Sequence, residues 1–139
     1  MEDTLTILKP DAVEQAIIGE VLHRIELDGL RISALKMIEL SDSRAEEFYG
    51  EHRDKPFFDG LVEFMTSAPI VPAVVSGEDA IRRLRTLMGA TDPSEAAPGT
   101  IRAEFAGGMP NNIIHGSDSP ESAKREIPFF FDEEEIHRG

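Results

Sequence analysis

The sequence predicts an α/β sandwich: a ferredoxin-like βαββαβ core in which helices lie on the faces of a four-stranded antiparallel sheet. Segments with the two-residue alternation of strands and segments with helical spacing follow one another in the order that this core requires. The predicted strands are short, and right-handed crossovers between them suit an antiparallel sheet. The chain has 139 residues and no stretch typical of a linker, so we expect a single domain over residues 1–139.

The first part of the chain supplies two strands and the helix between them. Thr4–Leu8 alternates polar and apolar residues and is expected to be a strand that Pro10 ends. Helical spacing then relates four apolar residues: Ile18, Val21, Leu22 and Ile25. Gly29 is a plausible stop for this helix, and the alternation over residues 31–40 predicts the second strand.

The middle of the chain predicts two helices and a third strand. Ser43 begins a capping-box pattern and is expected to open a helix that runs to about Glu51. Residues 57–66 have the spacing of another helix, and residues 69–75 have the composition of a strand. Pro72 cannot donate to a sheet ladder, which predicts an edge strand or a bulge.

The last part predicts a basic helix, a long loop, a short strand and a final helix. Residues 79–88 form the basic helix, and residues 89–111 are expected to be irregular. Residues 113–115 make the fourth strand. Ser119 is the expected N-cap of the last helix, with Pro120 at its first position, where proline fits.

Composition excludes several classes of function. The 27 acidic against 14 basic residues give a net charge of −13, which opposes binding to nucleic-acid backbones and anionic membranes. The absence of cysteine excludes disulfides and thiolate sites. No apolar run approaches the ~20 residues of a membrane span, and Met1–Thr4 lacks the character of a secretory signal, so we expect a cytoplasmic protein. The acidic tail, residues 132–139, is expected to be solvated.

The segment NIIHGSDSP places His115 at the end of a predicted strand, followed by Gly116. A histidine nucleophile needs an acceptor on its second ring nitrogen, and Glu126, about two turns into the next helix, could reach back to supply it. On spacing alone, a plain polar residue at a strand end is the commoner interpretation, and both interpretations stay open here. Any bound phosphate would depend on isolated cations such as Lys9, Arg85 and Arg102, because no glycine-rich phosphate motif is present.

Five segments together resemble the nucleoside diphosphate kinase family, in its order and at its spacing, from about Thr4 to Phe131. They are TLTILKPDAV, ALKMIELS, EHRDKPFFDGLVEFMTSAPIV, LRTLMGATDPSEAAPGTIR and NIIHGSDSPESAKREI. The resemblance implies an enzyme that moves the γ-phosphoryl group of a nucleoside triphosphate, usually ATP, to a nucleoside diphosphate in a ping-pong reaction through phosphorylated His115. It also implies Mg²⁺ bound with the nucleotide, and a homo-oligomer, hexamer or tetramer, built from dimers.

The family's site residues fall on matching positions of this chain. Besides His115, the resemblance implies catalytic roles for Lys9, Tyr49, Asn112 and Glu126. It implies nucleotide contacts by Lys9, His52, Phe57, Leu61, Arg85, Thr91, Arg102 and Asn112, with the base stacking on Phe57. Asp118 resembles the acid that approaches the nucleotide-bound Mg²⁺ indirectly, through water.

The chain departs from the family at Ala106–Asn111 and at Pro72, and the first departure is expected to alter the cleft wall. Two rival classes of protein fit the sequence less well. Enzymes of the phosphoglycerate mutase kind would carry Arg-His-Gly near the start, whereas Ile114 precedes this late histidine. A scaffold that kept the fold and lost the chemistry would not need intact Lys9 and His115.

Overall fold

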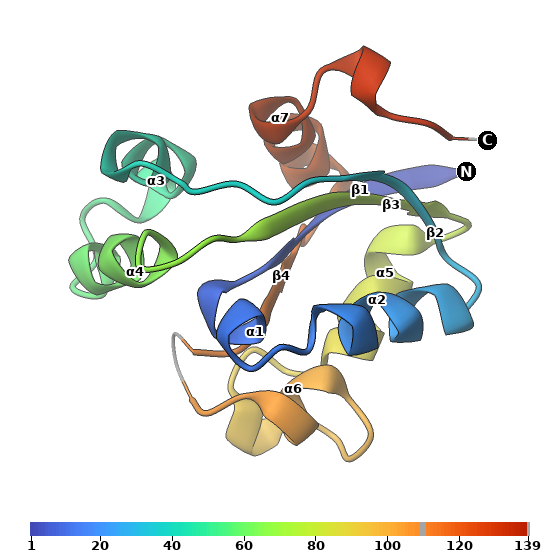
Figure 1. Cartoon of the computed structure of the whole chain (residues 1–139), viewed down its shortest axis with the longest axis horizontal. Coiled ribbons are helices and arrows are strands. Elements are labelled where there is room, and N and C mark those ends of the chain that lie inside the picture. Colours follow the sequence, from blue (N-terminus) through green and yellow to red (C-terminus); the bar gives the residue numbers. More distant parts are fainter. Residues whose placement is uncertain (109–110, 139) are drawn as a thin grey trace.

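The computed structural model of the chain describes residues 1–108 and 111–138. Its centre is one four-stranded antiparallel sheet with the strand order β2-β3-β1-β4, the arrangement of a ferredoxin-like core (Figure 1). The strands are β1 (Glu2–Leu8), β2 (Arg31–Leu35), β3 (Val71–Gly77) and β4 (Ile114–Gly116). The predicted fold class is confirmed.

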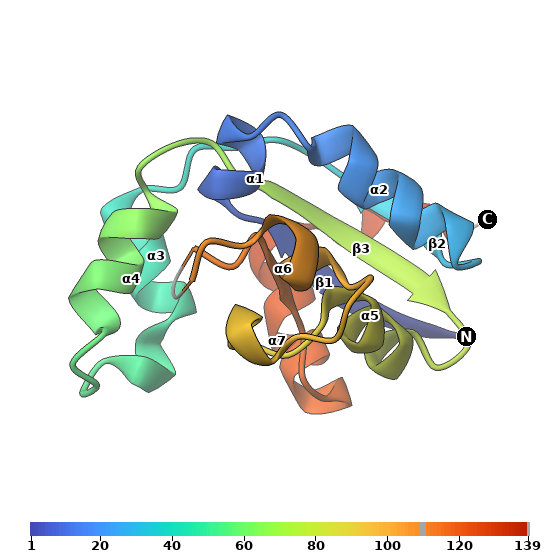
Figure 2. The ribbon, with the colours of Figure 1, turned by 90° about the horizontal axis from the view of Figure 1, so that it is seen from below.

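Helices cover both faces of this sheet. The α-helices are α1 (Pro10–Glu14), α2 (Ile18–Leu27), α3 (Asp42–Phe48), α4 (Phe58–Met65), α5 (Ala80–Met88), α6 (Ile101–Phe105) and α7 (Pro120–Phe130). Short 3₁₀ turns add η1 (Gly50–His52), η2 (Pro93–Glu95) and η3 (Glu133–Glu135). Seen from below in Figure 2, α3 and α4 lie side by side at one end, away from α2 and α5.

Two apolar cores follow from the alternation along the strands. Leu5 and Ile7 face a core that includes Met65 of α4 and Phe130 of α7. The neighbouring Leu8 turns to the other face, where its core includes residues of α2 and α5. Buried hydrophobic groups on both sides therefore fix the sheet and, with it, the position of β4.

Several predicted boundaries differ from the structure. The N-cap of α3 is Ser41 rather than Ser43, because the Ser41 hydroxyl accepts a hydrogen bond from the Arg44 amide at 3.2 Å. The same helix ends at Phe48, short of Glu51. The second strand stops at Leu35 after a bulge, and only an isolated bridge continues it.

Pro72 does not mark an edge, since β3 lies between β2 and β1. Its carbonyl accepts from the Lys36 amide at 3.2 Å, just beyond the last residue of β2. In an antiparallel strand the N–H and C=O of a residue point to the same side, so an N–H at position 72 would also point toward β2. There the regular pairing of β2 with β3 has already ended. The end of the β2 ladder thus tolerates the proline in a central strand.

The last third of the chain is more ordered than predicted. Residues 89–111 were expected to be irregular, yet they contain η2 and α6, whose N-cap is Thr100. The acidic tail is not simply solvated: Ile136 is buried, and the His137 amide donates to the Ser33 carbonyl at 2.7 Å. An apolar anchor and an edge contact with β2 hold this segment down. Among the described residues, no helix is long and apolar enough to cross a membrane.

Candidate active site

One cavity of about 760 Å³ lies between the α3–α4 pair and the segment around β4. Every site residue predicted from the sequence lines it: Lys9, Tyr49, His52, Phe57, Leu61, Arg85, Thr91, Arg102, Asn112, His115, Asp118 and Glu126. The structure therefore brings together residues that are spread over most of the chain. We call Lys9, Arg102, Asn112, His115 and Glu126 the β4 wall, and Tyr49, His52, Phe57 and Leu61 the α3–α4 wall.

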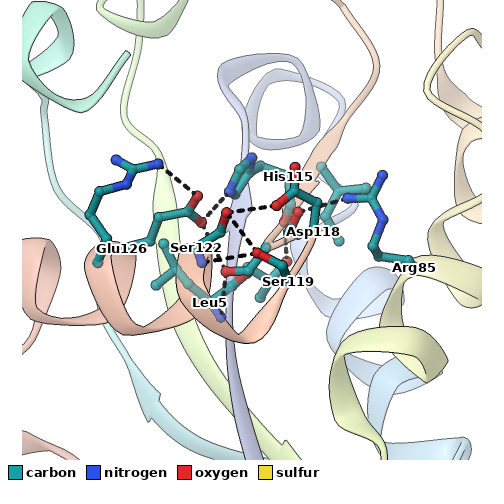
Figure 3. A network of polar contacts seen from close by, with 12 residues as sticks. Leu5, Arg85, His115, Asp118, Ser119, Ser122 and Glu126 are labelled. Carbon is teal, nitrogen blue, oxygen red and sulfur yellow. Dashed lines mark hydrogen bonds and ion pairs between the residues drawn. The ribbon is translucent and has the colours of Figure 1, made fainter. Parts of the chain in front are cut away.

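His115 lies on β4, where it pairs with Ile7 of β1. Its Nε2 atom is 2.7 Å from Oε1 of Glu126, which reaches over from α7 (Figure 3). The edge of the Phe48 ring faces the imidazole, with 5.8 Å between the ring centroids. The carboxylate and the aromatic ring together fix the plane of the imidazole.

Glu126 is buried, with only 5% of its surface exposed. Burial raises its pKa, but the hydrogen bond and charge of His115, together with Ser117 and Arg125, outweigh this effect and hold the pKa below its ordinary value. Ser117 also donates to Oε1, at 2.8 Å. An ionised carboxylate can only accept, so Nε2 of His115 donates in this pair, and in the neutral form of the imidazole the lone pair lies on Nδ1.

A strained turn leads into β4. Ile113 has a φ of +74°, and the Ile114 amide donates to the Asn112 carbonyl at 2.8 Å. This bond between residues i and i+2 closes a γ-turn of the rare, strained type, which β-branched residues seldom adopt. Such a conformation persists only where the surroundings enforce it.

Arg102 provides part of this enforcement. Its Nε donates to the Asn112 carbonyl at 3.2 Å and its Nη2 to the Ile114 carbonyl at 2.5 Å, on either side of the turn. Its Nη1 donates to the Gly89 carbonyl at 3.1 Å. Burial and the charge of Arg85 lower the pKa of Arg102 to about 10. The guanidinium stays charged at neutral pH and keeps two of its five N–H groups for a ligand.

Lys9 follows the first strand and donates from Nζ to Oδ1 of Asn112 at 2.6 Å. It is buried, and desolvation together with the charge of Arg102 lowers its pKa to about 8, against the opposing charge of Asp11. The Asn112 side chain also donates to the Thr91 carbonyl, at 3.0 Å. Lys9 is thus a cation held inside the cavity, mostly protonated at neutral pH.

Arg85 and Asp118 flank β4 on the side away from Glu126 (Figure 3). Arg85 donates from Nη1 to the Gly116 carbonyl at 2.9 Å. Asp118 accepts from the Ser122 hydroxyl at 2.6 Å, and this bond lowers its pKa against the opposing effect of desolvation. The carboxylate of Asp118 and the guanidinium of Arg85 therefore both line the cavity, as His115 does.

The α3–α4 wall is more open. Half of the Phe57 surface is exposed, and its ring lies 5.5 Å from that of His52 between centroids. Within the described residues, the Tyr49 hydroxyl and Nδ1 of His52 are buried without a hydrogen-bond partner. Desolvation, and then the charge of Glu126, raises the pKa of Tyr49, so its phenol is protonated.

Two nearby carboxylates were not predicted from the sequence. Glu51 lines the cavity and accepts from Arg125 at 3.3 Å. Asp11 accepts from the Ile113 amide at 3.0 Å through its Oδ2. In the sequence Asp11 only follows a strand end, and no local pattern indicates a contact with a residue 102 positions away.

The structure describes only part of the segment Ala106–Asn111, which was predicted to alter the cleft wall. Met109 and Pro110 lie outside the described residues. Before them, the Gly107 amide donates to the Asn111 carbonyl at 3.0 Å, which closes the base of the loop. Asn111 itself is exposed and does not line the cavity.

Comparisons with known proteins point to one family. The model of the family described as "Nucleoside diphosphate kinase" matches residues 2–136. The nucleoside diphosphate kinase of Campylobacter lari is 57% identical over 136 residues, 98% of this chain and 99% of that protein. The structure of the Aquifex aeolicus nucleoside diphosphate kinase has a TM-score of 0.95 at 51% identity, covering 97% of this chain and 98% of that one. A halophilic nucleoside diphosphate kinase from Halobacterium salinarum, in complex with CDP, has a TM-score of 0.96 at 45% identity, with 99% and 92% covered.

Proposed function

The chain belongs to the nucleoside diphosphate kinase family of enzymes, and from this premise we propose a ping-pong mechanism through a phosphohistidine at His115. In it, the γ-phosphoryl group of a nucleoside triphosphate, usually ATP, passes to the histidine and then to a nucleoside diphosphate. The observation that carries the proposal is the pair formed by His115 and Glu126, 2.7 Å apart in a cavity that also contains Lys9 and Arg102.

The chemical step follows from that pair. The lone pair of His115 Nδ1 attacks the γ-phosphorus, the bond from phosphorus to the bridging oxygen breaks, and the diphosphate leaves with that electron pair. Glu126 holds the Nε2 proton and stabilises the positive charge that develops on the ring. In the second half-reaction, a terminal oxygen of another nucleoside diphosphate attacks the phosphohistidine and restores the lone pair to Nδ1.

Cations of the cavity neutralise the charge on the phosphoryl oxygens. Lys9 and Arg102 are already in position, because each is held by hydrogen bonds of the β4 wall. Donors fixed in advance in a dry site stabilise developing charge without the cost of reorienting. Arg85, Thr91 and His52 complete the proposed phosphate contacts, and Tyr49 borders the histidine. Asn112 shares the ribose 3′-hydroxyl with Lys9.

The α3–α4 wall is the proposed base site. Phe57 offers an exposed ring face, with Leu61 beside it in the cavity lining. Stacking accepts any base, since every base has a π-face. The complex of the Halobacterium salinarum relative with CDP supports a nucleotide as ligand of this cavity.

Mg²⁺ is proposed to arrive with the nucleotide. The described residues include no group of three or more His, Asp or Glu side chains that could hold a metal ion by themselves. Asp118, ionised and facing the cavity, fits an ion bound mainly by phosphate oxygens and approached through water. The ion would supply charge neutralisation at the phosphates. The homo-oligomer, hexamer or tetramer, and the cytoplasmic location remain predictions from the sequence.

Labelling with γ-³²P-ATP tests the proposal. Brief incubation should leave one labelled phosphohistidine, stable to alkali and labile to acid, which an added nucleoside diphosphate removes. His115→Ala should remain unlabelled, whereas His23→Ala, a change on α2 outside the cavity, should label fully. Full labelling of the His115→Ala protein would end the assignment.

A further inference from the structure

The γ-turn at Ile113 depends on a carboxylate outside the cavity lining. Asp11, on α1, accepts from the Ile113 amide at 3.0 Å, and this contact is buried. The Ile113 carbonyl accepts from the Lys9 amide at 2.8 Å. Residues 9 and 11 of the chain therefore hold both backbone polar groups of the strained residue.

These two bonds hold the residue that lies between two groups of the proposed chemistry. Ile113 lies between Asn112, which holds the Lys9 ammonium, and the strand that carries His115. A change of φ at Ile113 would rotate the two neighbours relative to one another. Without an acceptor at Asp11, the Ile113 amide would be buried and unpaired, a strong incentive for the turn to relax.

Besides its bond to the Ile113 amide, Asp11 carries a charge that raises the pKa of Lys9. It does not line the cavity, so a direct contact with the nucleotide is not expected. Its second oxygen, Oδ1, is buried and has no hydrogen-bond partner in the described part of the chain. Burial raises the pKa of this carboxyl, so the position is costly for an acid. A buried carboxylate bonded to the amide of a strained residue points to a positioning role.

We propose that Asp11 is a positioning residue, which acts through the Ile113 amide to keep Asn112 and His115 in register for phosphoryl transfer. The proposal rests on the proposed function above. It differs from the simpler interpretation, in which Asp11 only stabilises the first turn of the five-residue helix α1. The simpler role predicts a loss of stability and no change in the chemistry of the folded protein.

The test compares Asp11→Ala, Asp11→Asn and the wild type, with Glu14→Ala as a control. Glu14 is an exposed carboxylate on the same helix. Asparagine keeps an acceptor for the Ile113 amide and can place its amide group where Oδ1 stands, whereas alanine removes the acceptor. Three quantities are measured below the unfolding temperature of each protein: the single-turnover rate of phosphohistidine formation from ATP, the dissociation constant of ADP, and hydrogen exchange at the Ile113 amide.

Asp11→Ala should lower the single-turnover rate about 10- to 100-fold, the usual penalty for a small displacement of reacting groups, and change the ADP dissociation constant less than about 3-fold. The Ile113 amide should exchange faster in that variant. Asp11→Asn should restore most of the rate and the protection, and Glu14→Ala should match the wild type.

Three results would overturn the inference. They are a rate for Asp11→Ala within about twofold of the wild type, an asparagine variant as slow as the alanine variant with its Ile113 amide still protected, and rapid exchange of this amide in the wild type. Rapid exchange in the wild type would overturn the inference even if Asp11→Ala does not fold, and in that case the rate of Asp11→Asn is compared with that of Glu14→Ala. If the wild type itself forms no phosphohistidine, the proposed function fails, and that outcome is distinct from all three.

Discussion

The two walls of the cavity differ in how completely their polar groups are satisfied. In the β4 wall, Lys9, Arg102 and Glu126 are each at most 8% exposed and are tied to other groups of the protein. In the α3–α4 wall, Phe57 is 51% exposed, and the Tyr49 hydroxyl is buried with no hydrogen-bond partner among the described residues. The side chains of the β4 wall are mostly held by other groups of the protein and those of the α3–α4 wall are not, which suits the proposed combination of fixed chemistry and a variable base.

The largest effect is expected from Lys9→Met, which removes a cation of the β4 wall and keeps most of the side-chain volume. Loss of one preorganised donor typically lowers the rate about 10²–10³-fold, and we expect kcat/KM to fall by that factor in the coupled steady-state assay. Lys36→Met is the matched control, because this lysine lies outside the cavity and pairs with Glu135 at 3.2 Å. A loss of less than about 10-fold for Lys9→Met would contradict the proposed role.

Glu126→Ala should have the next largest effect. It removes the acceptor of both His115 and Ser117. A hydrogen bond to a charged group is worth about 1.5–3 kcal/mol, which corresponds to a rate loss of about 10- to 100-fold. Single-turnover labelling measures it, with Glu121→Ala, an exposed carboxylate on the same helix, as the control. An unchanged labelling rate would remove the carboxylate from the mechanism.

The pH dependence of activity and stability should distinguish the β4 wall further, because its buried cation Lys9 has a pKa of about 8. As pH rises through that value, Lys9 loses its charge and kcat/KM for the free enzyme should fall up to about tenfold per pH unit. Stability should move in the opposite direction. Between about 8 in the folded state and 10.5 in the unfolded state, the unfolded chain binds more protons, so this residue makes the free energy of unfolding rise with pH.

The measurement is a pair of pH profiles, one of kcat/KM and one of urea unfolding, for the wild type and for Lys9→Met. The difference between the two proteins isolates the lysine from the other titrating groups. Parallel profiles in both proteins would show that another group controls them.

The smallest effect is expected on the open wall. Stacking on an aromatic ring contributes about 1–3 kcal/mol, and the exposure of Phe57 puts this ring at the low end, so Phe57→Ala should raise KM about 5- to 10-fold. ADP, GDP, CDP and UDP should all be affected alike. Leu35→Ala, a change at an exposed apolar residue on β2, is the control. A rise in KM confined to one nucleotide would show that Phe57 helps to select a base and does not simply stack on every base.

Sequence patterns predicted the elements whose signals are local. Helical spacing predicted α2, and Ser119 with Pro120 marked the start of α7 correctly. A local signal failed at the start of α3, where Ser43 was predicted to open the helix and Ser41 is the N-cap. Local signals also failed where the element is very short, as with α6, or where a single apolar residue such as Ile136 anchors an otherwise polar tail.

The candidate site shows the same division. The residues that the family resemblance implied as site residues all line one cavity, although their roles stay predictions and the lining also includes the unpredicted Glu51. The resemblance did not predict how the γ-turn at Ile113 is held, because the side chains of Asp11 and Arg102 bond backbone groups of the turn. Contacts of a side chain with a distant main chain leave no pattern in a single sequence.

The carbonyl contacts of Arg102 have a consequence for how substitutions combine. One guanidinium spans Gly89, Asn112 and Ile114, so it braces the architecture, and in the proposed mechanism the same group would also bind the phosphates. The effects of substitutions at Arg102 and at Asn112 should therefore be less than additive, and a double-mutant cycle between the two positions should show strong coupling. Nor can a lysine substitute for this arginine: its single ammonium preserves the charge but has no planar fork to bridge separate segments.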